Sequence, residues 1–438
     1  MKKKVLLVLD SDLYVRNYIR TGTVNYLSKV YDLEILFSKK IENYNDILLL
    51  KSVKKNYEFN SFFVKLFYYL NDIAIYLNRK KSSSFTLRIE NTINRMSIPW
   101  KFLKIISLNS FFFYVLKKIL NLYLYNFNEI NNYLLKNKFK LVIFPSSGLD
   151  LMSYYLPLIT KSTDIKTFFI VDNWDNISSK SYYLEKPSNI GVWGDQSKQH
   201  AYKIQDFEKT KIFLTGSARF QVYKRNFPYK KIYKFPYILF LGASVLSREQ
   251  ELLCIANKII ENNKKLFKNT KIIYRPHPWR QKQDKVLLEG LDNVIIDRQL
   301  KLVFDKNTYE TDDQPDLKYY PKLIYNSELI MGGLTSMLVE SLILEKKYLA
   351  FVFNDKNIFY NPSKRAERLE HFKILKKIED VKICNKINYD IIEKILTNQW
   401  KNKKIINKKN LNYYVNKIVI TPHPNYNKNL VRLIDRII

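Results

Sequence analysis

Cysteine is nearly absent from this 438-residue chain, and so are long apolar runs. The two cysteines, Cys254 and Cys384, are far apart and lack metal-type spacing, which indicates unpaired thiols in a reducing compartment. No stretch of about 18 apolar residues is free of charge, so no membrane-spanning helix is predicted. The apolar run from Val5 to Leu9 is too short for a signal peptide and is followed at once by Asp10, so it predicts a buried first strand.

Acidic residues are also in deficit, since 41 Asp and Glu stand against 74 Lys and Arg, for a formal net charge of +33. Lys, Asn, Ile and Tyr are enriched together, as expected of an AT-rich genome, so codon bias accounts for part of the lysine excess. A basic surface attracts nucleotides, anionic lipid head groups and nucleic acids alike. The chain has no RNA-binding fingerprint and no zinc spacing, and therefore neither specific nucleic-acid binding nor a metal site is predicted.

Strand-like segments alternate with helical ones in the first half of the chain. Segments 4–9 and 32–37 begin a β-α-β pattern, which predicts a parallel sheet. The pattern returns in KLVIFPSSGLD, KTFFIVDNWDNISSK, NIGVWGDQSKQHAYKI and KIFLTGSARF. Residues 50–137 between them are aromatic and basic with helical spacing. Two interpretations of this insertion stay open, namely helices that pack on the sheet and an amphipathic surface that docks on a bilayer.

A second α/β series follows, in YILFLGASVLSREQELLCIANKII, KIIYRPHPW, NVIIDRQ, SELIMGGLTSMLVESLILEKK and YLAFVF. The whole pattern predicts an α/β fold with two Rossmann-like domains that face each other across a cleft. The predicted parts are an N-terminal domain over 1–225 with the insertion at about 50–137, a C-terminal domain over 226–400, and a helical tail over 401–438 that packs back on the N-terminal domain.

Polar groups follow the predicted strands of the second half, where open parallel sheets bind ligands. Two glycines let the backbone approach a ligand, and hydroxyls at a helix start favour an anion. A histidine can donate to a phosphate oxygen, and a carboxylate one turn into the helix can accept from a ribose. Ordinary helix caps are the alternative interpretation. The residues predicted to bind a donor are Ser244, Arg275, His277, Gly332, Gly333, Thr335, Ser336 and Glu340.

Polar loops also follow the strands of the first half. The loop DSDLYVRNYIRTG holds two carboxylates, Asp10 and Asp12, as candidates for a general base, and Asp12 is preferred because it lies further into the loop. His277 is the third catalytic candidate, through stabilisation of a leaving group. The density of polar groups around one tryptophan suits a ligand rich in hydroxyls, although Asx-turns would also explain it. The predicted acceptor-binding residues are Asp172, Asn173, Trp174, Asn176, Ser178 and Lys180.

Several of these segments resemble the GT-B superfamily, which holds glycosyltransferases, sugar-nucleotide 2-epimerases and CDP-glycerol glycerophosphotransferases. They are VWGDQSKQHAYKI with KIFLTGSARF, the RPHP turn, GGLTSMLVESLILEKK and YLAFVF. One departure is the turn GSARF, which lacks the usual proline. The resemblance implies a donor bound by the C-terminal domain, an acceptor bound by the N-terminal domain, and displacement of a nucleoside diphosphate without a metal or other cofactor.

The predicted function is transfer of a sugar from a nucleotide-sugar donor to a cell-surface glycan or lipid-linked acceptor. A CDP-glycerol-type glycerophosphotransferase and a sugar-nucleotide 2-epimerase are alternatives of the same architecture. A non-catalytic basic binding protein is the alternative from another class. We expect a cytoplasmic protein, attached peripherally to the anionic inner face of the cytoplasmic membrane through its aromatic and basic helices.

Overall fold

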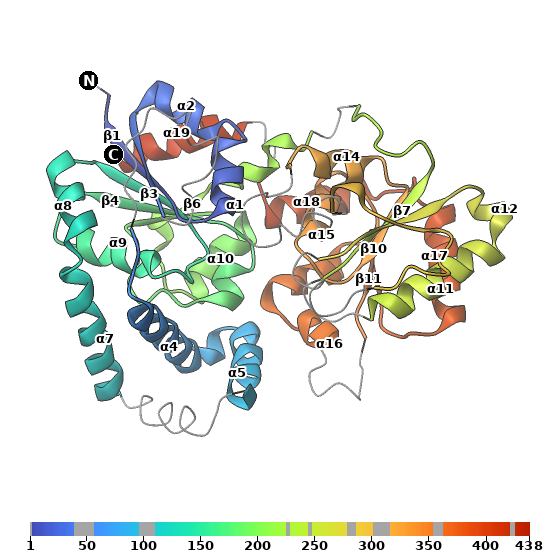
Figure 1. Ribbon diagram of the computed structural model, residues 1–438, viewed down its shortest axis with the longest axis horizontal. Helices are drawn as coiled ribbons and strands as arrows, with labels where there is room; N and C mark the ends of the chain where they lie inside the picture. Colours follow the sequence, from blue (N-terminus) through green and yellow to red (C-terminus); the bar gives the residue numbers. More distant parts are fainter. Residues whose placement is uncertain are drawn as a thin grey trace. The chain divides into compact units, whose positions relative to one another are not determined.

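The computed structural model describes residues 2–38, 57–95, 110–224, 228–243, 248–277, 286–300, 316–353, 362–420 and 425–438. The chain divides into two compact units (Figure 1). Unit 1 comprises Met1–Gln221 and Lys417–Ile438, and unit 2 comprises Val222–Asn416. The chain thus leaves unit 1 close to the boundary placed at 225, and it returns to unit 1 later than the predicted start of the tail at 401.

Unit 1 contains a parallel sheet with the strand order β2-β1-β3-β4-β5-β6. Successive residues of β1 point to opposite faces, and both faces are buried. Leu6 and Val8 belong to one hydrophobic core, and Val5 and Leu7 belong to the other. The strands are β1 (Lys4–Leu9), β2 (Asp32–Phe37), β3 (Leu141–Ser146), β4 (Lys166–Val171), β5 (Asn189–Val192) and β6 (Ile212–Leu214).

Helices cover each face of this sheet. On one face α2 (Thr23–Val30) lies beside the C-terminal helix α19 (Tyr426–Ile437), although the two are far apart in the sequence (Figure 1). The spacing of Tyr426, Leu430 and Ile434 puts these side chains on one stripe of α19, and all three are buried in the core with Val5. The other helical elements of unit 1 outside the insertion include α1 (Asp12–Tyr14), the π-helical turns Val15–Ile19 and Asn176–Lys180, α9 (Met152–Thr160) and α10 (Asp195–Lys203).

The aromatic and basic insertion is helical where it is described. Its elements are α4 (Ser61–Leu77), α5 (Ser83–Arg95), α7 (Ser110–Tyr125) and α8 (Asn128–Asn137). Phe67 and Leu70 of α4 and Leu124 of α7 are buried in the core that contains Leu6 of β1. Packing on the sheet is therefore established for the inner faces of these helices. No described helix is both long and apolar enough to cross a membrane.

Unit 2 repeats the plan with a parallel sheet of order β12-β11-β10-β7-β8-β9. The strands are β7 (Tyr237–Leu241), β8 (Lys271–Arg275), β9 (Val294–Ile296), β10 (Leu329–Gly332), β11 (Tyr348–Phe351) and β12 (Val381–Cys384). The helices include α11 (Glu249–Asn262), α12 (Lys264–Phe267), α14 (Tyr319–Tyr325), α15 (Met337–Ile343), α16 (Pro362–Glu367), α17 (Tyr389–Lys401) and α18 (Lys408–Ile418). The predicted class, α/β with two parallel-sheet domains, is confirmed, whereas the cleft between them stays a prediction.

Candidate functional site

Asp10 and Asp150 follow β1 and β3, the two neighbouring strands at which the strand order of the unit 1 sheet reverses. The neighbouring strands β1 and β3 form this switch point, since the chain continues from β1 to β2 on one side and from β3 through β4 to β6 on the other. Open parallel sheets bind ligands beyond the carboxyl ends of the strands at such a point. Asp10 comes directly after β1, and Asp150 lies four residues beyond Ser146 at the end of β3. This placement marks the pair as the candidate centre of a site.

Hydrogen bonds hold Asp150 in place. The Ser146 hydroxyl donates to its Oδ2 at 2.8 Å, and the backbone N–H of Ser153 donates to its Oδ1 at 2.6 Å. The Ser153 hydroxyl donates to the Asp150 carbonyl at 2.6 Å. Because Ser153 is in the first turn of α9, Asp150 also serves as a cap of that helix. The carboxylate is therefore fixed relative to β3 before any ligand arrives.

Burial changes the acidity of both carboxyl groups. It raises the pKa of Asp150 to about 6, although the hydrogen bonds from Ser146 and Ser153 lower it. Burial also raises the pKa of Asp10 well above its usual range, and the negative charge of Asp150 raises it further. The pair therefore keeps a proton at a pH where ordinary aspartates are ionised, so it can serve in proton transfer.

Asp172 follows β4, the next strand of the sheet, and is surrounded by positive charge. Burial raises the pKa of Asp172, while the charges of Arg219, Lys180 and Arg16 lower it. Asn17 donates to Asp172 Oδ1 at 3.3 Å and accepts from Arg16 Nε at 3.3 Å. Arg16 and Arg219 are both buried, and the Arg219 guanidinium lies 4.8 Å from the Trp193 ring centroid. The carboxyl edge of unit 1 thus combines acidic and basic groups rather than acidic groups alone.

The other residues predicted to bind the acceptor lie in the loop after Asp172. Trp174, Asn176 and Ser178 are almost fully buried. The backbone N–H of Trp174 donates to Oδ1 of the preceding Asn173 at 3.1 Å, and Lys180 Nζ lies 3.3 Å from Asp175 Oδ2. The loop is therefore a packed turn, in which Asp172, Asn173 and Lys180 remain partly exposed. Acceptor binding by this loop stays a prediction.

Asp12, the preferred base in the sequence, is the first residue of the short helix α1 and is partly exposed. Asp12 lies within α1 rather than at a strand end, and the sequence identified only Asp10 of the Asp10–Asp150 pair. Among the described residues, no cluster of three or more His, Cys, Asp or Glu is arranged to hold a metal ion.

The switch point of unit 2 lies between β7 and β10. Gly242 follows β7, and a Cβ there would lie 2.8 Å from the backbone nitrogen of His277. Gly332 ends β10 with φ +151°, and a Cβ there would lie 2.1 Å from the Leu241 carbonyl oxygen. Gly333 is buried, and its carbonyl accepts from the Tyr348 hydroxyl at 2.7 Å. The glycines thus allow close packing of the backbone segments that follow three neighbouring strands.

Polar side chains lie along this edge of unit 2. His277 follows β8, and Thr335 and Ser336 come between β10 and α15, all three partly exposed. Because β8, β7 and β10 are neighbours, the structure brings these groups to one edge of one sheet. That they line a single pocket stays a prediction. Ser244 lies outside the described residues.

Glu249 connects two loops at this edge and was missed in the sequence, where it looked like an ordinary helix-start acid. It is the first residue of α11 and is buried. Its Oε1 accepts from the backbone N–H of Ala243 at 3.0 Å, and its Oε2 accepts from the Tyr274 hydroxyl at 2.6 Å. Glu249 therefore holds the loop after β7 against β8, the strand that precedes His277.

Two residues predicted to bind the donor are hydrogen-bonded or ion-paired to other side chains of unit 2. Arg275, the last residue of β8, forms a buried ion pair with Asp297 and donates to Gln299 Oε1 at 2.9 Å. Glu340 is buried in α15 and accepts from the Tyr223 hydroxyl. The guanidinium charge of Arg275 is thus balanced by a carboxylate of the neighbouring strand end, which differs from the predicted role of neutralising a phosphate.

No family model matches the chain, and no curated protein matches it in sequence. Solved structures share its fold. The UDP-GlcNAc 2-epimerase of Methanocaldococcus jannaschii has a TM-score of 0.53 at 12% identity, over 99% of this chain and 99% of that one. The same epimerase solved with UDP-GlcNAc and UDP gives 0.50 at 14% identity, over 99% of each chain. MnaA of S. aureus, solved with UDP, gives 0.52 at 9% identity, over 99% of this chain and 96% of that one. The two-sheet architecture is therefore of the GT-B type.

Proposed function

We propose that the protein is an enzyme that transfers a glycosyl group from a nucleoside-diphosphate sugar to a hydroxyl group of a surface glycan or lipid-linked acceptor. The observation that carries this proposal is the Asp10–Asp150 pair, two carboxyl groups with raised pKa at the switch point of unit 1. The proposal assigns the acceptor to this edge of unit 1 and the donor to the β7–β10 edge of unit 2.

The carboxyl pair supplies the proton acceptor that this reaction needs. One carboxylate takes the proton of the acceptor hydroxyl, whose oxygen forms a bond to the anomeric carbon of the donor. The bond from that carbon to the diphosphate breaks, and the nucleoside diphosphate leaves with the electron pair. A general base contributes about 10²–10⁴-fold to such a step. The proton is then released from the pair to solvent.

The donor site is proposed at His277, Thr335 and Ser336 of unit 2. These groups follow β8 and β10 at the carboxyl edge of the sheet, where they can donate to diphosphate oxygens. The same fold binds UDP in the S. aureus protein and UDP-GlcNAc and UDP in the archaeal epimerase, which supports a nucleotide here.

A sugar-nucleotide 2-epimerase is the second candidate, and the same pair favours it. Two carboxyl groups that keep one proton between them can remove a proton from one face of a carbon and return one to the product. Epimerisation needs no acceptor hydroxyl, and the solved structures of the same fold include such an epimerase.

Product analysis separates the two candidates. We expect wild-type protein incubated with UDP-GlcNAc, UDP-glucose or CDP-glycerol to release the free nucleotide only when a glycan acceptor is present, because a transferase needs the acceptor to complete the reaction. The products are followed by proton NMR. If a sugar nucleotide is converted to its 2-epimer without acceptor, the protein is an epimerase and not a transferase. Release of CMP together with transfer of glycerol phosphate would instead identify a CDP-glycerol-type glycerophosphotransferase.

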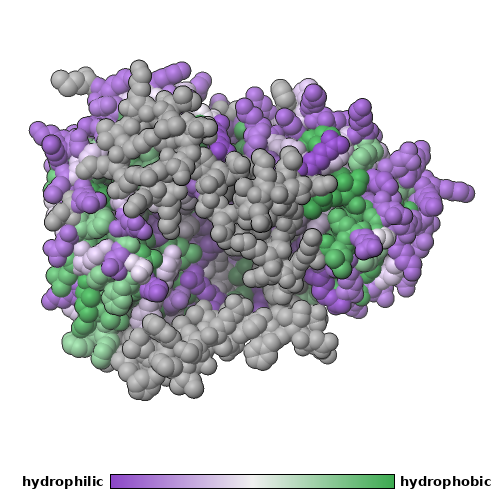
Figure 2. All heavy atoms as spheres, in the orientation of Figure 1, coloured by the Kyte–Doolittle hydropathy of each residue, from purple (hydrophilic) through white to green (hydrophobic). Residues whose placement is uncertain are grey.

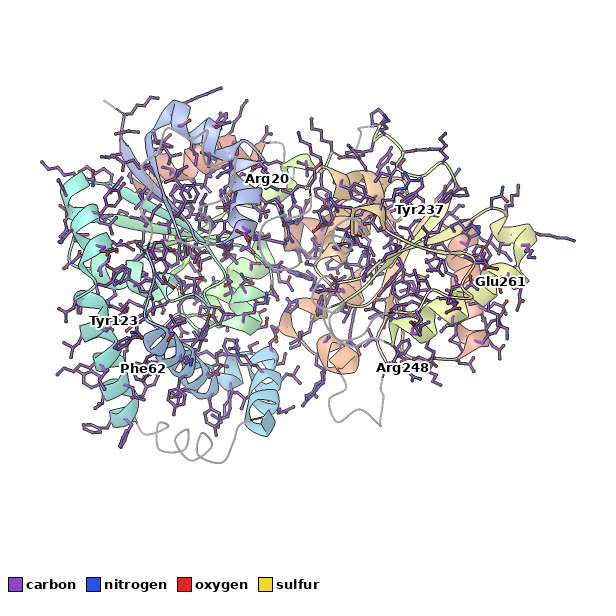
Figure 3. The ribbon with its side chains drawn as sticks, viewed as in Figure 1. Arg20, Phe62, Tyr123, Tyr237, Arg248 and Glu261 are labelled. Atoms are coloured by element: carbon purple, nitrogen blue, oxygen red, sulfur yellow. The ribbon has the colours of Figure 1, made fainter. Side chains whose placement is uncertain are left out.

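We also propose that unit 1 attaches to anionic membranes through an apolar surface on α7 and α4. Figure 2 shows a hydrophobic area over α7. Phe63 of α4 stacks on Tyr123 of α7 with ring centroids 3.7 Å apart, which fixes the two helices together. Phe62 and Tyr123 lie in this part of unit 1 (Figure 3). The exposed large apolar side chains of this surface are Phe62, Tyr68, Leu77, Phe111, Phe112, Tyr114, Ile119, Leu122 and Tyr125.

Lysines among these aromatic side chains suit an anionic bilayer. Lys65 and Lys118 are exposed on the same two helices, and the whole chain carries a formal net charge of +33. Aromatic residues with lysines are typical of segments that lie in the membrane interface without crossing it. A lipid-linked acceptor would be presented at such a surface.

Removal of three aromatic rings from α7 should weaken membrane attachment. We expect the variant Phe111→Ser, Phe112→Ser, Tyr114→Ser to bind vesicles of anionic lipid at least about tenfold more weakly than wild type, because each ring loses apolar area buried in the interface. Flotation at low salt measures this. The variant Leu287→Ser, Ile405→Ser is the matched control, since both side chains are exposed on unit 2. Equal loss in the control, or no binding by wild type, would refute the proposal.

A further inference from the structure

The hydroxyl group of Tyr57 is buried and has no hydrogen-bond partner among the described residues. Its side chain is only 6% exposed, and its hydroxyl oxygen is buried and unsatisfied. A buried hydroxyl that forms no hydrogen bond costs stability, so such groups are rare unless a ligand or a catalytic role explains them. Tyr57 therefore indicates a place where a polar group from outside the chain is received.

Tyr57 belongs to the same hydrophobic core as Val8, two residues before Asp10, and Leu151, the residue directly after Asp150. Burial is the largest cause of the raised pKa of Tyr57, and the charges of Asp10 and Asp150 are the next. The same two charges raise the pKa of Tyr68, whose side chain on α4 is 45% exposed. The charges of the carboxyl pair thus act on one buried phenol and on one that is partly exposed. Aromatic faces beside carboxylates are well suited to a sugar, which has an apolar ring face and hydroxyl edges.

The charges around the pair favour an uncharged ligand. Asp172 is balanced by Arg16, Arg219 and Lys180, which are the cations that act on it. Among the described residues, no cation is one of the groups that shift the pKa of Asp10 or Asp150, so an anionic group placed between them would be repelled. A neutral hydroxyl meets no such repulsion, and it can both accept from the phenol and donate to a carboxylate.

We propose that Asp10, Asp150 and Tyr57 form a subsite that binds one hydroxyl group of an uncharged sugar, with Tyr57 donating to the sugar oxygen and a carboxylate accepting its proton. Identification of this sugar as the acceptor rests on the proposed function. Tyr57 is a binding and specificity residue in this account, because it selects a group that can accept a hydrogen bond beside the carboxyl pair.

The test compares Tyr57→Phe with Tyr155→Phe in the full-length protein. Tyr155 is also buried in unit 1, but its hydroxyl donates to the Phe127 carbonyl at 2.8 Å. Without ligand, we expect the Tm of Tyr57→Phe to stay unchanged or to rise, because the lost hydroxyl had no partner. The Tm of Tyr155→Phe should fall by about 2–4 °C, because that variant removes the hydrogen bond that this buried hydroxyl donates.

Sugar binding is then measured by saturation-transfer difference NMR with glucose, galactose and N-acetylglucosamine as probes. We expect wild type and Tyr155→Phe to bind at least one probe equally well, and Tyr57→Phe to bind it about tenfold more weakly. A fall in the Tm of Tyr57→Phe that matches Tyr155→Phe, unchanged sugar binding by Tyr57→Phe, or no binding of any probe by wild type would overturn the subsite.

Thermal shift with UDP and CDP on the same samples separates this proposal from the proposed function. Nucleotide binding without sugar binding would leave the donor assignment in place and overturn the subsite. Sugar binding that depends on Tyr57 without nucleotide binding would support the subsite and overturn the donor assignment.

Discussion

Replacement of Asp150 by asparagine is expected to lower turnover by about 10²-fold or more while donor affinity stays unchanged. Asparagine keeps the size of the side chain and an oxygen that can accept from the Ser153 N–H, so the cap of α9 is retained. It cannot take a proton from the acceptor. Asp10→Asn should have an effect of similar size, and the double variant should lose little more, because the two carboxyl groups act as one unit.

The pH dependence of wild type provides a second readout of the same pair. Since burial raises the pKa of Asp150 to about 6, kcat/KM should rise as the pH increases through this value, because a base must lose its proton before it can act. This rise should be absent from the residual activity of Asp150→Asn. Steady-state kinetics between pH 5 and pH 8 with donor binding by calorimetry would measure both effects.

Asp12→Asn is the matched control for these variants. Asp12 lies two residues beyond Asp10 in the same loop, at the start of α1, and is outside the pair. We expect near-normal turnover from Asp12→Asn. Loss of turnover in Asp12→Asn with normal turnover in Asp10→Asn and Asp150→Asn would show that Asp12 is the base and that the pair has only a structural role.

Replacement of Arg275 by methionine is expected to lower the free energy of unfolding by about 3–5 kcal/mol. The side chains of Arg275 and Asp297 are 4% and 0% exposed, so removal of the cation leaves a buried carboxylate without its counter-charge. The tyrosines that donate to Asp297, Tyr233 at 3.3 Å and Tyr319, would remain, but hydroxyl dipoles replace a full charge poorly. Denaturant unfolding measures the loss.

Arg248→Met is the control in the same unit (Figure 3). Arg248 forms an ion pair with Glu251 one turn along, and both side chains are about two-fifths exposed, at 42% and 40%. Exposed pairs of this kind contribute about 0–1 kcal/mol. If Arg275→Met cost no more than Arg248→Met but abolished nucleotide binding, Arg275 would be a phosphate ligand, as the sequence suggested, rather than a structural residue.

The strands could be predicted from the sequence because they are short apolar runs that end in polar turns. KVLLVL and YILFL are buried on both faces of their sheets, and so their apolar character is continuous. The residues after the strands were therefore recognisable as site candidates, and Asp10, Asp172 and His277 were found in this way.

Asp150 was missed because it lies beyond a turn rather than at the strand end. The segment PSSGLD predicts a turn at Ser147 and Gly148. Asp150 follows this turn, but its carboxylate accepts a hydrogen bond from Ser146 at the end of the strand. The same strand-end argument, extended past the turn, would have found it. No pattern around Tyr57 marks it as a site residue, because its proposed role depends on which strand ends the fold places beside it.

The role of Arg275 could not be decided from its own segment. A strand-end arginine beside prolines is compatible with a phosphate ligand or with an ion pair, and the choice depends on the neighbouring strand. Since β9 pairs with β8 in register, Asp297 after β9 comes beside Arg275 at the end of β8. Strand order and register, which periodicity does not reveal, are therefore needed to place Asp297 beside Arg275.

A thermal-shift screen of nucleoside diphosphates and their sugars tests most directly whether the protein uses a nucleotide-activated donor. The screen uses wild type and the variant Thr335→Val, Ser336→Ala. We expect at least one of UDP, CDP, GDP and their sugar derivatives to raise the Tm of wild type, since a ligand that binds only the folded state stabilises it. The rise should be reduced or lost in the variant. No rise with any of these compounds, while the protein remains folded, would contradict the account.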